Sequence, residues 1–535
     1  MLRGRFISAI IFNVDRTFMR LRRYMQKRRY KVKRIHKSWV SFGTGLRAVL
    51  CDMLVMLQLA AMVALYCFAC YKAPIFWYVS LGLTLLTVVY VLICEPDIQS
   101  KISWTALLVL SFGCGFYAYV LSRKCVCYFY KRQRFARISK NVQPLVGSFQ
   151  PKNCSGRVRS DCEYIYKTGG FIPYDGTDAK YYPYARQALD NLIARIDCAE
   201  KFVFIEFFIV ADGVLLDRLI SIFRRKVAEG VEIRFLYDDV GSAGVLSSSA
   251  IKRIRSTGVK LKAFSRLFSP FYFGLNYRDH RKIVVVDGKT GYLGGFNLID
   301  DCANQRKMEG IWKDSGLRLD GAAVDGLSLA FMRQWELATR EKLDYKKYLD
   351  KYDRTSNKSL YAPYAGGPEI KEPLCRGVYM RIIHGAKQKL YIMSPYLVPD
   401  SGLMRALKAK VKEGVDVRLI LPGVPDYRYL YRVTQSNAIR LIKSGVKVYY
   451  SSGEFVHSKV MLSENCAAVG SVNLDMRAFY QEFDNGVYLN DPAVMCDIEA
   501  DFSEVFSRGG ECSNTKQGPF TAFAAWVLKI VSPLM

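Results

Sequence analysis

The apolar residues of this chain follow two different patterns. Three long apolar segments lie at residues 53–71, 74–94 and 102–121. Each is close to the roughly 20 residues that a helix needs to cross a bilayer. Beyond about residue 150, short β-rich runs alternate with amphipathic patterns that end at glycine, as in "DRLISIFRRKVAEG". We therefore predict a helical membrane region at 48–122, with two or three apolar helices, followed by an α/β body.

Basic residues flank the apolar region on both sides. Residues 1–47 form an arm dense in Lys and Arg, and 123–155 form a second basic segment, the juxtamembrane linker. Such a segment can be a solvated disordered arm, but the apolar segments that follow favour an arm that binds the headgroups of anionic membrane lipid. Both flanks should lie in the cytoplasm, because basic residues are enriched on that side. Three full crossings would separate the flanks, so we expect 53–71 to lie in the interface or to re-enter the membrane. The other two segments then form a hairpin, with the body on the cytoplasmic face.

The overall charge adds one constraint. The 535 residues carry 78 Lys and Arg against 48 Asp and Glu, a formal net charge of +30. This balance indicates a polyanionic partner: nucleic acid, an anionic membrane surface or a phosphate-bearing substrate. The 15 cysteines are scattered and odd in number, which favours a reducing compartment over a disulfide framework.

The body contains one sequence unit twice. In the same order along the chain, "EGVEIRFLYD" (229–238) matches "EGVDVRLILPG" (413–423), "LGGFNLID" (293–300) matches "VGSVNLDM" (469–476), and "KDSGLRL" (313–319) matches "FDNGVYL" (483–489). We predict two pseudo-symmetric α/β units, at 156–345 and 371–511, each with a central mixed β-sheet flanked by helices. Residues 346–370 are then the linker, and 512–535 an apolar or amphipathic tail.

The repeat also carries the candidate chemistry. "HRKIVVVD" (280–287) matches "HSKVMLSE" (457–464), so His280 and Lys282 recur as His457 and Lys459. Side chains alternate along a strand, which places each histidine and its lysine on one face. The last members of the two motifs, Asp287 and Glu464, fall on the opposite face, where we expect them to support their own unit. Downstream asparagines recur as well, as Asn297 and Asn473.

One histidine and one lysine from each unit, meeting at a pseudo-two-fold interface, would form a phosphate site. Two ammonium groups and two amides can stabilise charge on phosphate oxygens. One imidazole can attack phosphorus while the other protonates the leaving oxygen. No carboxylate cluster for a metal is apparent near either histidine, so we expect neither a metal nor another cofactor. The repeat offers Asp314 to orient His280 and Asp484 to orient His457.

These paired motifs resemble the phospholipase D superfamily, whose signature is H-x-K-x4-D followed by a Gly/Ser-x-Asn turn. More narrowly, the chain resembles bacterial cardiolipin synthases of this type, from about residue 50 to the end. The resemblance implies a multi-pass enzyme of the bacterial cell membrane that condenses two phosphatidylglycerol molecules to cardiolipin and glycerol through a phosphatidyl-histidine intermediate.

The same resemblance implies roles for individual residues. His280 is then the nucleophile and His457 the general acid and base, although the symmetry of the repeat leaves their order open. Lys282, Asn297, Lys459 and Asn473 become phosphate ligands. Asp287 matches the motif, whereas Glu464 stands where the family has aspartate.

Other functions fit parts of the pattern. A transferase with another acceptor, or a hydrolase, would carry the same motifs. A nuclease would suit the charge, but the apolar segments favour lipid over nucleic acid as the substrate. A non-catalytic scaffold that binds anionic lipid would have no need of two intact H-x-K pairs. The oligomeric state cannot be derived from the sequence.

Overall fold

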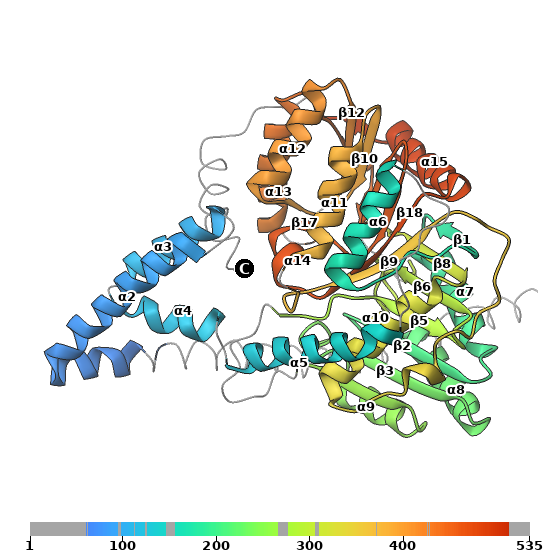
Figure 1. Cartoon of the computed structure of the whole chain (residues 1–535), viewed down its shortest axis with the longest axis horizontal. Helices are drawn as coiled ribbons and strands as arrows, with labels where there is room; N and C mark the ends of the chain where they lie inside the picture. Colours follow the sequence, from blue (N-terminus) through green and yellow to red (C-terminus); the bar gives the residue numbers. More distant parts are fainter. Residues whose placement is uncertain are drawn as a thin grey trace, which may run out of the picture.

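The computed structural model describes residues 60, 63–94, 98–111, 113–123, 126–145, 156–265, 277–304, 310–370, 372–424, 426 and 428–512. Two α/β units lie against each other, and a group of N-terminal helices projects from them (Figure 1). The predicted fold class is confirmed, because two mixed sheets with flanking helices follow one another along the chain.

The first unit is built on a seven-stranded sheet with the order β1-β8-β6-β5-β2-β3-β4. Strand β2 pairs in parallel with β3, and β3 with β4, while the other neighbours pair antiparallel. The central strands are almost wholly apolar because helices and the second unit cover both faces. The strands are β1 (Thr177–Tyr182), β2 (Phe202–Phe207), β3 (Glu232–Asp238), β4 (Lys260–Phe264), β5 (Ile283–Val286), β6 (Thr290–Gly294) and β8 (Gly316–Gly321).

The second sheet repeats this arrangement strand for strand. Its order is β19-β13-β12-β10-β15-β16-β18-β9. Counted from β9, its first seven strands show the same series of antiparallel and parallel pairings as the first sheet counted from β1. The internal repeat is therefore a repeat of structure. The strands are β9 (Tyr361–Gly366), β10 (Lys389–Met393), β12 (Asp416–Leu421), β13 (Lys447–Tyr450), β15 (Val460–Ser463), β16 (Ala467–Gly470), β18 (Asp484–Leu489) and β19 (Gly510–Glu511).

The boundary between the units differs from the predicted one. Strand β9 lies inside the range 346–370, yet it pairs with β18 along its whole length. It is therefore the edge strand of the second sheet, matching β1 in the first. The pattern "YAPYAGG" contains a proline and small residues, so its composition resembles a linker although its place in the sheet makes it a strand.

Helices cover the sheets, and some of them pack against both units. Helix α10 (Val324–Thr339) is buried over nearly all its length and packs on β2, β5 and β9. One continuous core includes apolar residues of both sheets. The other helices of the body are α6 (Gly156–Gly169), α7 (Ala185–Asp197), α8 (Val214–Ala228), α9 (Ser248–Arg255), α11 (Leu374–Gly385), α12 (Ser401–Lys412), α13 (Arg428–Ile442), α14 (Met476–Tyr480) and α15 (Pro492–Arg508), with the 3-10 turns η1 (Gln143–Leu145) and η2 (Tyr345–Lys347).

Two helices cross from one unit to the other. Helix α6 precedes the first unit but packs on α11 and β9 of the second. Helix α15 closes the second unit but packs on β1 of the first. Its Asp501 accepts hydrogen bonds from Lys313 Nζ at 2.5 Å and from the Tyr181 hydroxyl at 2.7 Å. The two units therefore form one interlocked body.

The N-terminal region is less regular than predicted. Among the described residues one helix, α2 (Pro74–Cys94), is long and apolar enough to cross a membrane. Residues 102–121 do not form a single helix: α3 (Ile98–Leu110) and α4 (Gly115–Arg123) are separated by a turn in which Gly113 has φ +93°. That conformation is easy for glycine and interrupts an α-helix. A shorter apolar helix spans Val63–Lys72.

Helices α2, α3 and α4 lie together, away from the body (Figure 1). Several large apolar side chains of α2 are exposed, among them Ile75, Leu86 and Ile93. A basic helix, α5 (Val126–Val142), then leads to the body and packs on α10. The basic arm at 1–47 lies outside the described residues, as do residues 513–535 of the tail.

Candidate active site

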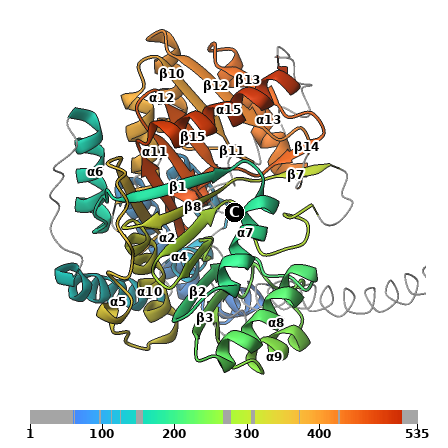
Figure 2. The same ribbon diagram turned by 90° about the vertical axis from the view of Figure 1, so that its right-hand side faces the viewer.

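The two H-x-K motifs lie at the junction of the units, just before the strands β5 and β15. Two short strands pair across this junction: β7 (Ile311–Lys313) runs parallel to β14 (Glu454–Val456) (Figure 2). The backbone N–H of His457 continues this pairing by donating to the carbonyl of Lys313 at 2.7 Å. On the other side of the pseudo-two-fold axis, the N–H of His280 donates to the carbonyl of Phe483 at 2.8 Å. Main-chain bonds therefore bring both histidines to one interface.

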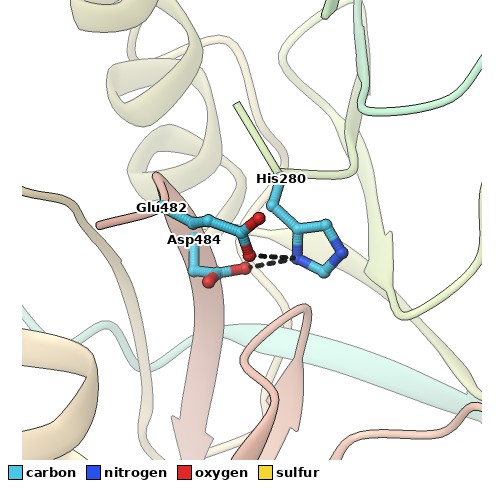
Figure 3. A group of neighbouring side chains, drawn as sticks. All are labelled: His280, Glu482 and Asp484. Carbon is cyan, nitrogen blue, oxygen red and sulfur yellow. Dashed lines mark hydrogen bonds and ion pairs between the residues drawn. The ribbon is translucent and has the colours of Figure 1, made fainter. Parts of the chain in front are cut away.

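The same bonds decide which carboxylate meets which histidine. The residue after Phe483 is Asp484, and its Oδ1 lies 2.9 Å from His280 Nδ1 (Figure 3). The residue after Lys313 is Asp314, and its Oδ2 lies 2.6 Å from His457 Nδ1. The predicted pairing within each unit is therefore wrong. Each histidine contacts the aspartate of the other unit, because backbone pairing across the junction places that aspartate opposite it.

These contacts fix the chemical state of the imidazoles. At His280, the Asp484 carboxylate holds the proton on Nδ1 and leaves Nε2 with its lone pair. At His457, Asp314 favours the protonated ring, whereas burial and Lys459 oppose it. In Figure 3 the second ring nitrogen of His280 points away from the carboxylates. Burial and the neighbouring Lys282 hold the pKa of His280 well below its usual value, and burial with Lys459 lowers the pKa of His457. His280 is therefore neutral near pH 7 and can act as a nucleophile.

Both lysines of the motifs are buried beside the histidines. The Nζ of Lys282 donates to the His280 carbonyl at 2.5 Å, and the Nζ of Lys459 lies 2.8 Å from His457 Nδ1. Burial and the mutual repulsion of the two ammonium groups lower the pKa of Lys282 to about 7, and burial lowers that of Lys459 to about 8. Two lysines buried beside the histidines are suited to an anion such as phosphate, whose charge would favour their ammonium forms.

The two asparagines follow strands that end beside the motifs. Asn297 comes three residues after β6, and Asn473 three residues after β16, at the edges of the sheets where β5 and β15 begin. Asn297 Oδ1 accepts the backbone N–H of Ile209 at 3.2 Å, which fixes its side chain. Asn473 is buried, and its Oδ1 has no hydrogen-bond partner among the described residues.

The last members of the two motifs turn away from the site, as strand alternation predicts. Asp287 accepts the backbone N–H groups of Glu200, Lys201 and Phe202 at 2.8, 2.7 and 2.9 Å. These bonds tie the end of β5 to the start of β2. Glu464 stabilises the equivalent turn before β10, where its carboxylate accepts one backbone N–H at 2.8 Å and two more at 3.4 Å. A glutamate can therefore replace the aspartate because the position supports the fold.

Removing these carboxylates should weaken the fold and leave the chemistry of the folded protein intact. Asp287→Ala leaves three N–H groups without an acceptor and should cost about 2–4 kcal/mol of stability. Glu464→Ala should cost about 1 kcal/mol, since its bonds are longer and the side chain is half-buried. Thermal denaturation in detergent measures both changes. Loss of turnover in fully folded Glu464→Ala protein would contradict this expectation.

Comparisons with known proteins agree with this geometry. Residues 192–316 and 379–506 match the family described as cardiolipin synthase, phospholipase D-like domain. A cardiolipin synthase of Geobacillus kaustophilus is 33% identical over 65% of this chain and 70% of its own length. One of Staphylococcus aureus (strain Mu50) is 31% identical over 69% of this chain and 76% of its own. The chain belongs to the bacterial cardiolipin synthases of the phospholipase D superfamily. It is a phospholipid phosphatidyltransferase.

Two further comparisons show how far the similarity extends along the chain. An uncharacterized protein of Streptococcus mutans is 32% identical over 84% of this chain and 99% of its own length. The crystal structure of a phosphatidylserine synthase from Haemophilus influenzae covers 71% of this chain and 98% of its own, with a TM-score of 0.54 and 13% identity. This likeness shows a shared fold. The predicted membership of the superfamily is confirmed by the family match and by the cardiolipin synthases described above.

Within this family fold, the two halves of the site are not equal. Asp484 also accepts the hydroxyl of Ser471 at 2.6 Å. The equivalent residue in the first unit is Gly295, where a Cβ atom would lie 2.2 Å from Asp314 Oδ1 and 2.9 Å from the His457 carbonyl. Glycine is therefore required beside His457, whereas serine fits beside His280. The difference between "GGFN" and "GSVN" in the sequence has this steric cause.

The prediction that no carboxylate cluster lies near either histidine is wrong. Ligand atoms of His280, Glu482 and Asp484 lie within 4.8 Å of one another, close enough to hold a metal ion. Each acid already has a partner, however. Arg477 Nε lies 2.7 Å from Glu482 Oε1, and Ser471 and His280 both contact Asp484 Oδ1. The donor set is therefore better suited to hydrogen bonding than to metal ligation.

Glu482 lies near His280, and the sequence did not predict it as a site residue. It stands two residues before Asp484 in "QEFDNG". This spacing places both carboxylates on one face of an extended segment. That alternation was the available signal, but it depended on knowing that Asp484 meets His280.

Proposed function

We propose that this protein is a cardiolipin synthase that joins two phosphatidylglycerol molecules and releases glycerol. The observation that carries the proposal is the meeting of two H-x-K pairs at the junction of two repeated units, with each Nδ1 bonded to a carboxylate. The curated relatives named cardiolipin synthase support the choice of substrate. Neither nucleic acid nor a further cofactor is needed for this reaction.

In the first step His280 Nε2 attacks the phosphorus of one phosphatidylglycerol. The bond from phosphorus to the glycerol headgroup breaks, and His457, which enters this step protonated on both ring nitrogens, gives its Nε2 proton to the leaving glycerol oxygen. Lys282 and Lys459, with Asn297 and Asn473, stabilise the charge that builds on the phosphoryl oxygens. The product of this step is a phosphatidyl-histidine and free glycerol.

In the second step the headgroup hydroxyl of another phosphatidylglycerol attacks the same phosphorus. His457, now neutral, takes the proton of that hydroxyl, and the bond between phosphorus and His280 breaks. Cardiolipin is formed, and both histidines return to their first state. Asp314 stabilises His457 in its charged form, and Asp484 keeps His280 in the tautomer that attacks.

The N-terminal helices suggest where this reaction takes place. Helix α2 and its exposed apolar side chains suit a bilayer. We place the protein in the bacterial cell membrane as a multi-pass protein with its body on the cytoplasmic face. The basic arm at 1–47 would then lie against anionic lipid.

The proposal is tested with membrane-embedded protein and phosphatidylglycerol labelled in the headgroup and in the acyl chains. With a chelator present, we expect cardiolipin and glycerol in equal amounts. Formation of phosphatidic acid alone would identify a hydrolase. A phosphatidyl ester of another added alcohol, formed in preference to cardiolipin, would identify a different acceptor. Either result overturns the proposal.

A further inference from the structure

The residues that cross the junction can be matched in pairs about the pseudo-two-fold axis. His280 donates its N–H to Phe483, and His457 donates its N–H to Lys313. Phe483 therefore corresponds to Lys313, and Asp484 to Asp314. The residue one position earlier is Glu482 on one side and Trp312 on the other. Equivalent backbone positions therefore place a carboxylate beside one histidine and an indole ring beside the other.

The charge around the two Nδ1 atoms differs accordingly. On one side, Asp484 Oδ1 is 2.9 Å and Glu482 Oε2 3.9 Å from His280 Nδ1 (Figure 3). On the other side, one carboxylate and one ammonium group contact His457 Nδ1: Asp314 Oδ2 at 2.6 Å and Lys459 Nζ at 2.8 Å. Each histidine also has the lysine of its own motif nearby, Lys282 at His280 and Lys459 at His457, so the charged group that distinguishes the two sides is the carboxylate of Glu482.

Glu482 is held firmly in this place. Its side chain is 6% exposed, and Arg477 Nε lies 2.7 Å from its Oε1. The other charged groups that influence it are His280, Asp484 and Asp475. Arg477 secures the carboxylate through Oε1, while the atom nearest His280 is Oε2.

We propose that Glu482 is a positioning residue that gives His280, and not His457, the role of nucleophile. The inference rests on the proposed function. When Nε2 forms its bond to phosphorus, the imidazole becomes a cation, with the proton on Nδ1 facing Asp484. A second carboxylate within about 4 Å stabilises that cation strongly in a buried site. At His457 the matching position holds Trp312, and the centroids of its ring and the imidazole are 5.2 Å apart. The indole side chain carries no negative charge.

The test is Glu482→Gln, which keeps the size of the side chain and removes its charge. The matched control is Glu499→Gln, which removes the same charge from α15, where Glu499 pairs with Lys389. Rapid quenching with acyl-labelled phosphatidylglycerol measures formation of the phosphatidyl-protein, and peptide mapping locates the label. We expect label on His280 in the wild type and in Glu499→Gln, and about tenfold slower labelling in Glu482→Gln.

The two steps separate a positioning role from a general loss of structure. Glu482 stabilises the intermediate, so its loss should slow formation of the phosphatidyl-histidine but not the transfer from it to the second lipid. Damage to the fold would slow both steps. Glu482→Asp keeps the charge and should restore labelling in part, even if Glu482→Gln lowers the melting temperature.

Three outcomes overturn the inference. They are wild-type label on His457, labelling of Glu482→Gln at the wild-type rate, and labelling of Glu482→Asp no faster than that of Glu482→Gln. Failure of the proposed function is distinct, because the wild type would then form neither cardiolipin nor a phosphatidyl-protein.

Discussion

Replacing His280 by alanine is expected to lower phosphatidyl transfer on the order of 10⁴-fold, the largest effect of any single change at this site. The variant has no nitrogen to accept the phosphatidyl group, so no covalent intermediate can form. Rapid quenching with labelled phosphatidylglycerol should therefore detect no labelled protein. His280 is buried and its ring contacts Phe208 at a centroid distance of 5.0 Å, so the melting temperature is measured alongside to confirm that the variant is folded.

The matched variant is His457→Ala, and a second substrate separates the two roles. A donor lipid with p-nitrophenol as its leaving group needs no proton from the enzyme to depart. In the first turnover, His457→Ala should release p-nitrophenol from this donor at nearly the wild-type rate, although it fails with phosphatidylglycerol. His280→Ala should fail with both donors. If His280→Ala releases p-nitrophenol in a burst and His457→Ala does not, the roles are reversed.

Several features of this site could be predicted from the sequence because they depend on local geometry. The pairing of His280 with Lys282 follows from strand alternation near β5, and the position of Asp287 on the other face follows from the same rule. The repeat is visible in the sequence because both units have the same strand order, so their matching segments follow one another in the same order along the chain. The same rule placed Glu464 on the face turned away from the site, where a glutamate can stand in place of aspartate.

Other features depend on how the units meet, and the sequence holds no local signal for them. Asp314 and His280 lie in one unit, so their pairing was the natural expectation. The true partner of His280 is set by a backbone bond to Phe483, more than 200 residues away along the chain. Glu482 escaped notice for the same reason. The length of an apolar segment likewise cannot reveal a break such as the one at Gly113, where the turn lies between α3 and α4.

The second large prediction follows from the pairing of each histidine with the aspartate of the other unit. Asp484→Asn should lower transfer about 10³- to 10⁴-fold, because an amide can present N–H to Nδ1 and favour the wrong tautomer of His280. Asp314→Asn should also impair transfer from phosphatidylglycerol, since it acts on His457. Both side chains are fully buried, and asparagine is chosen because it keeps the volume of the original aspartate.

The donor with p-nitrophenol then shows which histidine each aspartate serves. It bypasses the proton from His457, so Asp314→Asn should release p-nitrophenol in the first turnover within a few-fold of the wild-type rate. Asp484→Asn should remain as slow as it is with phosphatidylglycerol, because attack by His280 is still required. Pairing within each unit would produce the opposite pattern, with Asp314→Asn slow and Asp484→Asn nearly normal. Each variant differs from the wild type by one heavy atom, and both are measured in the same assay, so the comparison depends on which histidine each carboxylate contacts.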